Sequence, residues 1–484
     1  MSTAAPIIVW FERDLRLADN PALAEAVQSG RPVLPLFVLD DATAGPWRRG
    51  AASRWWLDRS LAALARDLTT VGLPLLLRRG PAARAVPAVV AESGAAAVVW
   101  NRRYEPWSRP RDAAIKEMLA QSGIAVRSHN AGLLREPWEV RTGEGEPYRV
   151  FTPFWRTLRA IGVAGRPLPA PAAATAPASL PAGDRLEDWD LSPRRPDWAG
   201  GLRRTWSPGE AGARRRLTEF LSAGLAGYRD GRDRPDRPGT SMLSPHLHFG
   251  ELSPRLVWSA VADAVAADPG LAAGGEAYRR ELGWREFSHH LLFHHDRLPD
   301  APLRAEFADM PWRRAPDELR AWQRGRTGYP IVDAGMRQLW ETGWMHNRVR
   351  MVVASFLVKD LLIPWQEGAA WFWDTLVDAD LANNSASWQW VAGCGADAQP
   401  FFRVFNPVLQ GRKFDPDGAY VRRFVPELAR LPASWIHEPW KAPADVLAEA
   451  GVRLDRDYPR PIVDHGAARG RALAALEATR RSAA

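Results

Sequence analysis

Residues 378–390 read Asp-Ala-Asp-Leu-Ala-Asn-Asn-Ser-Ala-Ser-Trp-Gln-Trp and combine acids, amides and indoles within one short stretch. The whole chain holds 24 Trp against only 7 Tyr. Ordinary core packing favours Leu, Ile or Phe, because a buried indole is large and its N–H needs a hydrogen-bond partner. The stretch is therefore a candidate for holding a redox-active ring and for carrying electrons to it.

Composition limits the classes of protein to consider. With 484 residues, 46% of them hydrophobic and 25% charged, the chain can bury large cores and is expected to form two or more domains. Lys and Arg exceed Asp and Glu by 64 to 56, and the net charge of +8 suits a polyanionic partner without requiring one. Cys394 is the single cysteine, which excludes an internal disulfide framework and a zinc or iron–sulfur centre built on several thiolates. We expect no metal and a cytoplasmic location.

No segment suggests a membrane role. The longest hydrophobic candidate, residues 351–363, is interrupted by Lys359 and Asp360 and is too short to span a bilayer. The N-terminus places charged residues directly after a short apolar run, so the hydrophobic region of a secretory signal is absent.

Hydrophobic periodicity predicts an α/β domain with a parallel, Rossmann-like sheet over residues 1–135. Predicted strands and helices alternate there, which is typical of parallel sheets. The predicted strands are 7–10, 33–39, 75–77, 97–100 and 124–126, and the predicted helices are 21–28, 53–68, 83–92 and 110–121. The Gly-x-Gly-x-x-Gly fingerprint of dinucleotide sites does not follow the first strand.

The remainder divides into a connector and a helical domain. We predict an interdomain connector over residues 136–201, because proline and alanine dominate from Gly162 to about Gly200. Residues 202–484 carry mostly helical patterns and are predicted to form an all-helical domain. Its clearest predicted helices are 277–294, 333–342, 348–361 and 368–377.

A polar turn in the helical half is a candidate phosphate site. Tyr228, Arg232 and the run 239–245 bring hydroxyls, a cation and backbone N–H groups to the start of a predicted helix. An ordinary Ser or Thr helix cap would show the same pattern, so the motif alone leaves both readings open.

The run 344–351 supplies a second polar face. It sets Asn347 and Met351 one helical turn apart, with Arg350 on the adjoining face. Arg350 could pair with Asp378 in a buried site, but spacing cannot distinguish that pair from a surface ion pair.

Several long motifs, in order along the chain, resemble the DNA photolyase and cryptochrome family. The motifs are residues 10–16 (Trp-Phe-Glu-Arg-Asp-Leu-Arg), 240–244, 281–287, 344–351 and 378–390. The resemblance extends over about residues 6–463. It implies an α/β N-terminal antenna domain and an all-helical C-terminal FAD-binding and DNA-binding domain, which agrees with the division predicted from periodicity.

The resemblance implies a set of FAD contacts. They are Tyr228, Arg232, Thr240, Ser241, Met242, Leu243, Ser244, Arg350, Asp378, Asp380 and Asn384. Arg350 and Asp378 resemble the ion pair beside the isoalloxazine ring, and Asp380 resembles the acceptor at its polar edge. Asn384 falls where photolyases place an amide near flavin N5. An amide is uncharged and tolerates an anionic reduced flavin, whereas plant cryptochromes carry an acid there. Asn384 therefore favours repair over signalling.

The substrate implied by the resemblance is DNA that contains a cyclobutane pyrimidine dimer (CPD). Trp284 and Trp390 resemble aromatic walls that stack on the flipped-out lesion, and Glu281 and Asn347 resemble groups that hydrogen-bond the fused bases. Eukaryotic-type (6-4) photolyases have His where this chain has Asn347 and Met351, so a CPD enzyme is expected. The alternative is a cryptochrome-like blue-light photoreceptor. A dark flavin oxidoreductase would need a nicotinamide site, and the sequence shows none.

Three tryptophans, Trp312, Trp365 and Trp388, match the family's electron-transfer chain to the flavin. Residues 101–112 lie where the family binds an antenna chromophore. There Trp107 could stack on a pterin or a deazaflavin, and we expect methenyltetrahydrofolate in preference to 8-hydroxydeazaflavin. The protein is expected to act as a monomer.

Overall fold

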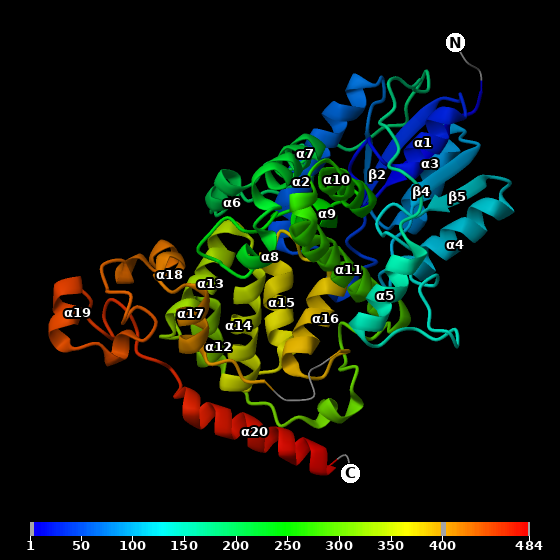
Figure 1. The fold of residues 1–484 in the computed structure, drawn as a ribbon. Helices are drawn as coiled ribbons and strands as arrows, with labels where there is room; N and C mark the ends of the chain where they lie inside the picture. The colour runs from blue at the N-terminus through cyan, green and yellow to red at the C-terminus, as the bar shows by residue number, and fades with distance from the viewer. Residues whose placement is uncertain (1–3, 398–402, 483–484) are drawn as a thin grey trace. The chain divides into compact units, whose positions relative to one another are not determined.

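The computed structural model describes residues 4–397 and 403–482 (Figure 1). By its internal contacts the chain divides into two compact units. Unit 1 comprises Met1–Ala226, Ser241–Asp296 and Val377–Asp380. Unit 2 comprises Gly227–Thr240, Arg297–Leu376 and Leu381–Ala484.

Unit 1 is built on a five-stranded parallel sheet with the order β3-β2-β1-β4-β5, drawn in blue to cyan in Figure 1. The strands are β1 (Ile7–Phe11), β2 (Val33–Leu39), β3 (Leu76–Arg79), β4 (Ala97–Asn101) and β5 (Ala125–His129). Each overlaps one of the predicted strands. Every residue of β1 and β2 is buried, which explains why these strands read as continuous apolar runs and not as alternating ones.

Helices connect successive strands and cover the sheet. They are α1 (Pro21–Gln28), α2 (Ala51–Thr70), α3 (Ala82–Ser93) and α4 (Ser108–Gln121). The predicted parallel, Rossmann-like sheet is therefore confirmed. Strand residues such as Ile8 and Val98 share one core with Val86 of α3 and Ile115 of α4. Helix α1 also contacts β1, β4 and β5, and Asn20 caps its first turn by accepting from the N–H of Leu23 at 3.1 Å.

The strand order matters for the position of the site. Strands β1 and β4 are neighbours although they are not consecutive, so the loops that follow them leave the carboxyl edge of the sheet at its topological switch point. Ligands of open α/β sheets bind at this edge. Here the loops begin with Glu12 and Arg102, the first residues after the two strands.

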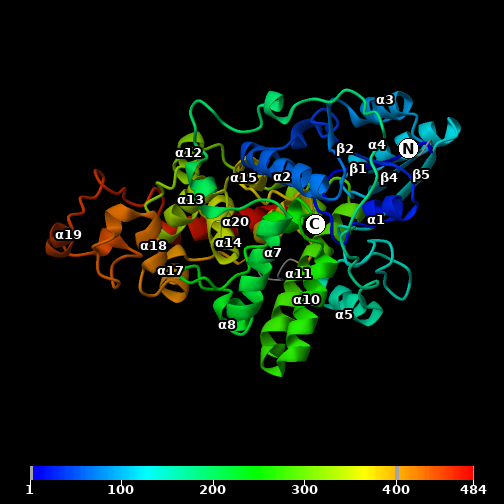
Figure 2. The ribbon, with the colours of Figure 1, turned by 90° about the horizontal axis from the view of Figure 1, so that it is seen from above.

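The rest of unit 1 contains a long segment with little regular structure, followed by helices. Residues 162–185 form no helix or strand, in keeping with their proline content. The elements of this part are α5 (Phe151–Ile161), η2 (Leu186–Trp189), α6 (Gly200–Thr205), α7 (Glu210–Glu219), η3 (Phe220–Gly224), α9 (Ser244–His248), α10 (Pro254–Ala267), η4 (Pro269–Leu271) and α11 (Ala272–His294). Helices α10 and α11 lie side by side, and α5 packs on α11 (Figure 2).

Among the described residues of unit 2 the regular elements are helices, apart from one isolated bridge, Leu454 to Tyr458. Its larger helices are α12 (Pro316–Gln323), α13 (Pro330–Thr342), α14 (Asn347–Ser355), α15 (Trp365–Thr375), α16 (Leu381–Ala392), α17 (Pro407–Phe414), α18 (Ala419–Phe424), α19 (Ala444–Ala450) and α20 (His465–Ser482). Its short elements are α8 (Tyr228–Gly231), η5 (Ala305–Asp309), η6 (Phe356–Asp360), η7 (Pro426–Leu428) and η8 (Pro439–Lys441). The predicted helix 348–361 is α14 continued by the π-helical turn η6. Helices α13 with α14, and α15 with α16, form packed pairs.

Two kinds of feature are absent from the described residues. None of the helices there has the length and apolar character that crossing a membrane requires. No group of three or more His, Cys, Asp or Glu side chains is arranged there to hold a metal ion.

Candidate functional site

The residues predicted for the site are distributed over the two units. Unit 1 holds Ser241, Met242, Leu243, Ser244, Glu281, Trp284, Asp378 and Asp380. Unit 2 holds Tyr228, Arg232, Thr240, Trp312, Asn347, Arg350, Met351, Trp365, Asn384, Trp388 and Trp390. The predicted pair of Arg350 with Asp378 joins residues of different units and stays a prediction. Within unit 2 the guanidinium Nε of Arg350 donates to the carbonyl of Met345 at 2.8 Å.

The predicted phosphate turn begins with a close approach of two glycines in unit 2. A Cβ on Gly239 would lie 2.3 Å from the carbonyl oxygen of Gly231, so only glycine fits there. Arg232 follows Gly231 and places its guanidinium carbon 5.8 Å from the ring centre of Tyr228. The close approach therefore positions the loop after α8, which carries the predicted cation.

The hydroxyl part of the turn is fixed by α11 of unit 1. Ser241 Oγ accepts from the hydroxyl of Tyr278 at 3.1 Å and from the N–H of Leu243 at 3.3 Å. Burial raises the pKa of Tyr278 to about 12, so its hydroxyl keeps the proton that it donates. Met242 has a φ of 51°, in the left-handed region, and α9 then starts at Ser244, as predicted for a turn that begins a helix.

Asp380 lies among three basic side chains of unit 1. Its Oδ2 is 3.5 Å from His289 Nε2, 3.6 Å from Arg13 Nη1 and 3.7 Å from His248 Nδ1. Burial opposes ionisation of Asp380, but the charge of His289 and hydrogen bonds from His248 and His289 hold its pKa well below the usual range. Burial lowers the pKa of His248 to about 4. Asp380 is therefore a carboxylate at neutral pH and can accept hydrogen bonds.

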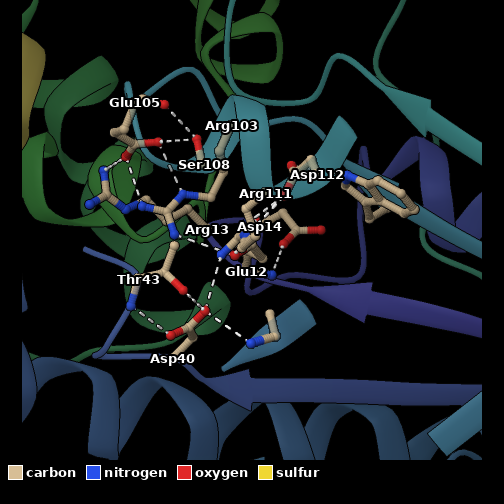
Figure 3. Close-up of polar contacts among 12 residues, drawn as sticks. Glu12, Arg13, Asp14, Asp40, Thr43, Arg103, Glu105, Ser108, Arg111 and Asp112 are labelled. Atoms are coloured by element: carbon tan, nitrogen blue, oxygen red, sulfur yellow. Dashed lines mark hydrogen bonds and ion pairs between the residues drawn. The ribbon is translucent and has the colours of Figure 1, made fainter. Parts of the chain in front are cut away.

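Arg13 links Asp380 to a buried ion-pair network at the carboxyl edge of the sheet. Figure 3 shows the part of this network formed by Arg13, Glu105 and Arg103, together with Arg111 and Glu12. Its Nη1 lies 2.7 Å from Glu105 Oε1, which also binds Arg103 at 2.9 Å, and Arg111 binds Glu12 at 2.8 Å. Burial alone would raise the pKa of Glu105, but Arg103 and Arg13 lower it. Glu12 and Glu105 are each 6% exposed, so the charges at this edge are satisfied by one another and not by water.

Asn384 is buried in α16 of unit 2. Its Nδ2 donates to the carbonyl of Ala369 in α15 at 3.0 Å. This bond fixes the orientation of the amide and leaves Oδ1 as its acceptor. The side chain is thus suited to accept a hydrogen bond while adding no charge.

Trp388, also in α16, is buried in an aromatic cluster of unit 2. Its ring centre lies 5.0 Å from Phe372 and 6.3 Å from Trp322, with both pairs in edge-to-face geometry. Gly368 makes room for the indole, because a Cβ there would lie 2.1 Å from Trp388 Cη2. Trp365 is buried at the start of α15, whereas Trp312 and Trp390 are half-buried. Transfer of electrons through Trp312, Trp365 and Trp388 stays a prediction.

Asn347 and Met351 lie one turn apart on α14, as the spacing indicates. Asn347 is exposed, and Met351 is half-buried with its sulfur 3.8 Å from Arg348 Nη1. The preceding His346 is buried and accepts from the N–H of Arg348 at 3.2 Å, which caps the helix. The Asn347 side chain is therefore accessible to a ligand that approaches from solvent.

Trp284 and Glu281 lie one turn apart on α11 of unit 1, and both are half-buried. The indole of Trp284 stacks on the ring of Phe151 with 3.6 Å between ring centres and 7° between planes. Phe287 meets Trp284 at a steeper angle of 73°, with 6.0 Å between ring centres. Trp284 is thus held by neighbouring rings and is not a freely moving surface side chain.

Two family models match the chain. One, for DNA photolyase, matches residues 7–173, and the other, for the FAD binding domain of DNA photolyase, matches residues 278–478. The chain belongs to the DNA photolyase and cryptochrome family. The fold class expected of this family, an α/β domain followed by a helical FAD-binding domain, is confirmed for this photolyase-family protein.

Named relatives and solved structures support the same family membership. A deoxyribodipyrimidine photo-lyase of Agrobacterium fabrum is 51% identical over 479 residues, with 99% of each chain covered. Cryptochrome-1 of Arabidopsis thaliana is 43% identical over 479 residues, which cover 97% of this chain and 70% of that protein. The crystal structure of a bacterial class III photolyase from Agrobacterium tumefaciens matches with a TM-score of 0.95 at 51% identity, covering 99% of each chain.

Several side chains that contact the predicted residues of this photolyase-family protein were not predicted from its sequence. They are Arg13, His248 and His289 around Asp380, Trp322 beside Trp388 and Phe151 behind Trp284. Arg13 lies in the N-terminal motif that carries the family resemblance, so a signal for it was present.

Proposed function

We propose that the chain is a light-driven lyase that repairs cyclobutane pyrimidine dimers in DNA with reduced FAD. When bound, excited FAD in its reduced form supplies the electron that opens the cyclobutane ring and takes it back afterwards. The 51% identity to a deoxyribodipyrimidine photo-lyase over the whole chain supports this activity. The observation that carries the choice of repair is the amide at Asn384.

Asn384 suits a reduced flavin because of its charge and its hydrogen bond. Its Nδ2 already donates to Ala369, so the amide can offer Oδ1 to the N–H that reduced flavin carries at N5. An acid at this position would place a negative charge beside an anionic ring. The side chain therefore stabilises the fully reduced state on which repair depends.

The remaining polar residues have the chemistry that FAD requires. We assign the diphosphate to the turn that carries Arg232, Ser241 and Ser244, because a cation and hydroxyl donors suit phosphate oxygens. We assign the polar edge of the flavin ring to Asp380, whose low pKa keeps it an acceptor. Tyr228, Thr240, Met242, Leu243, Arg350 and Asp378 complete the proposed FAD contacts.

We assign lesion binding to the aromatic and polar residues that match the family motifs. Trp284 and Trp390 stack on the bases, and stacking of this kind contributes on the order of 1 to 3 kcal/mol per base. Glu281 and Asn347 hydrogen-bond the lesion, with Met351 beside Asn347. Flipping costs least for a damaged base, so stacking of this size selects the lesion.

We propose that Trp388, Trp365 and Trp312 reduce a resting, oxidised flavin by passing electrons inward. Two of the three, Trp365 and Trp388, are buried, and a buried indole keeps an ordered position along such a route. The chain serves activation of the flavin and takes no part in repair by flavin that is already reduced.

We propose methenyltetrahydrofolate as the antenna chromophore in preference to 8-hydroxydeazaflavin. This proposal is supported by the switch point of the sheet, because the flat tricyclic ring of a deazaflavin would need a largely apolar pocket there. That edge carries the buried ion pairs of Glu12, Arg103, Glu105 and Arg111 instead (Figure 3).

The proposed partner is DNA that contains cyclobutane pyrimidine dimers, and the net charge of +8 favours the approach of a polyanion. We propose that the protein acts as a monomer in the cytoplasm. The single cysteine, Cys394, is buried, which suits a reducing compartment.

Asn384→Asp tests the role of the amide. The added carboxylate is expected to lower the reduction potential of bound flavin by tens of millivolts, on the order of 60 mV for each tenfold change in a one-electron equilibrium. Repair under light should fall in parallel, because less flavin stays reduced. Spectroelectrochemical titration and a repair assay measure the two effects.

Asn383→Asp is the matched control, because it adds the same charge one residue earlier on α16. Asn383 is half-buried and points to a different side of the helix. If bound flavin has the same reduction potential in the two variants, Asn384 does not lie beside the flavin. An illuminated parent that carries reduced FAD and restores no thymines would contradict the proposed function itself.

The second candidate is a cryptochrome-like blue-light photoreceptor. The observation that favours it is the 43% identity to cryptochrome-1 of Arabidopsis thaliana over 97% of this chain. A photoreceptor of this kind would bind FAD and respond to blue light without restoring thymines, so the repair assay separates the two functions.

A further inference from the structure

The indole of Trp284 is fixed by a stack of rings contributed by two helices. Phe151, the first residue of α5, is completely buried and lies parallel to Trp284 on α11, with 3.6 Å between ring centres. On α5 itself, Trp155 stacks with Phe151 at 6.2 Å and 11°. Gly283 allows Trp155 to approach α11, because a Cβ there would lie 2.4 Å from Trp155 Cε3.

The geometry of the Phe151–Trp284 pair indicates that the surrounding packing imposes this ring stack. Aromatic rings prefer offset or edge-to-face contacts at 4.5–7 Å over a direct sandwich, because their quadrupoles repel. A separation of 3.6 Å at 7° is such a sandwich. Trp155, which approaches α11 at Gly283, stacks on Phe151, and Phe151 in turn fixes the plane of the Trp284 ring.

This arrangement leaves one side of Trp284 for a ligand. The face covered by Phe151 cannot receive a base, and Phe287 approaches the indole at a steep angle. Trp284 is nevertheless half-buried and not fully buried, so part of the indole still meets solvent. A stacked base must therefore use the face opposite Phe151.

We propose that Phe151 is a positioning residue for lesion recognition, which holds the Trp284 indole in the orientation that stacks on the flipped pyrimidine dimer. This inference rests on the proposed repair function. A side chain that is ordered before binding loses little freedom when the ligand arrives, whereas a mobile one weakens binding. Phe151 thus acts through Trp284 and needs no contact with DNA.

Phe151→Leu tests the proposal, because leucine keeps an apolar side chain of moderate size and removes the flat surface behind the indole. The dissociation constants for an oligonucleotide with one CPD and for the same oligonucleotide without it are measured at one salt concentration. The affinity ratio, which is the dissociation constant for the undamaged oligonucleotide divided by that for the CPD oligonucleotide, is expected to fall by roughly threefold to tenfold, the loss that immobilising one side chain entails. Phe151→Met provides a second variant of similar volume if the leucine variant proves unstable.

Phe154→Leu is the matched control on the same helix. Phe154 is 2% exposed and packs on Phe287 and His290, so the same substitution removes core surface without touching the face of Trp284. Its affinity ratio should equal that of the parent. An unchanged ratio in Phe151→Leu, or an equal fall in Phe154→Leu, would overturn the proposal.

A double-mutant cycle with Trp284→Ala shows whether Phe151 acts through the indole. In the Trp284→Ala background, Phe151→Leu should lower the ratio no further, because the ring that it positions is absent. An additive loss would show that Phe151 acts elsewhere and would overturn the inference. A parent that does not distinguish CPD-containing DNA from undamaged DNA would instead contradict the proposed function, and the inference with it.

Discussion

Trp284→Ala is expected to weaken binding of CPD-containing DNA by roughly tenfold to a hundredfold, which corresponds to the loss of 1 to 3 kcal/mol of stacking on one base. Binding of undamaged DNA should change far less, because phosphate contacts dominate there and do not involve a flipped base. FAD content should stay at the parent value if the indole faces the substrate. Equilibrium binding to both DNAs at one fixed salt concentration measures the effect.

Trp258→Ala is the control for a general loss of packing. Trp258 is also a half-buried indole of unit 1, and it contacts Trp155 edge-to-face at 6.0 Å. The control should leave the ratio of the two affinities unchanged. If Trp284→Ala weakens binding of damaged and undamaged DNA equally, Trp284 is a packing residue and the assignment of the stacking wall is wrong.

Trp388→Phe is expected to reduce photoreduction of oxidised flavin to a small fraction of the parent rate. Phenylalanine fits the space beside Phe372 and Gly368 but is much harder to oxidise than an indole, so the electron route is interrupted. Repair by enzyme that has been reduced chemically should match the parent, because the route serves activation only. Transient absorption of the flavin and a repair assay with pre-reduced enzyme measure the two quantities.

Trp322→Phe makes the same change in the neighbouring indole. Trp322 is completely buried, lies 6.3 Å from Trp388 and donates its Nε1–H to the carbonyl of Val353 at 3.0 Å. Because it is not one of the three proposed carriers, photoreduction should continue in this variant. Photoreduction at the parent rate in Trp388→Phe would show that Trp388 is not an electron carrier. An equal loss of photoreduction in both variants would contradict the proposed order of carriers.

The fold was predictable where local patterns are strong. Strands β1 and β2 follow from apolar runs, because a parallel sheet covered on both faces needs apolar residues at nearly every position, whereas the edge strand β5 (AVRSH) has no fully buried residue and was predicted only from its first, apolar part. Helix α5 was not predicted, since it lies within residues 136–201, which were assigned as a connector, just before their proline-rich part. Its signal was nevertheless present: Phe151, Phe154, Trp155 and Leu158 are spaced for one helical face and are all buried.

The candidate site was predictable only through family motifs and not through its contacts. The carboxylate of Asp380 and the guanidinium of Arg13 are separated by most of the chain, and periodicity carries no information about such a pair. The same holds for Phe151 and Trp284. Residue types at motif positions indicate which chemistry is possible, whereas the side chains that hold them in place appear only in the folded chain.

Repair of a defined lesion under light distinguishes a CPD photolyase from a photoreceptor or a dark flavoprotein. Purified protein with chemically reduced FAD is mixed with an oligonucleotide that carries one thymine dimer, and restored thymines are counted after blue illumination and after an equal time in the dark. We expect intact thymines to accumulate with the absorbed light dose and none to form in the dark. Fully reduced, FAD-loaded protein that binds the lesion and restores no thymines under light would contradict the assignment as a CPD photolyase.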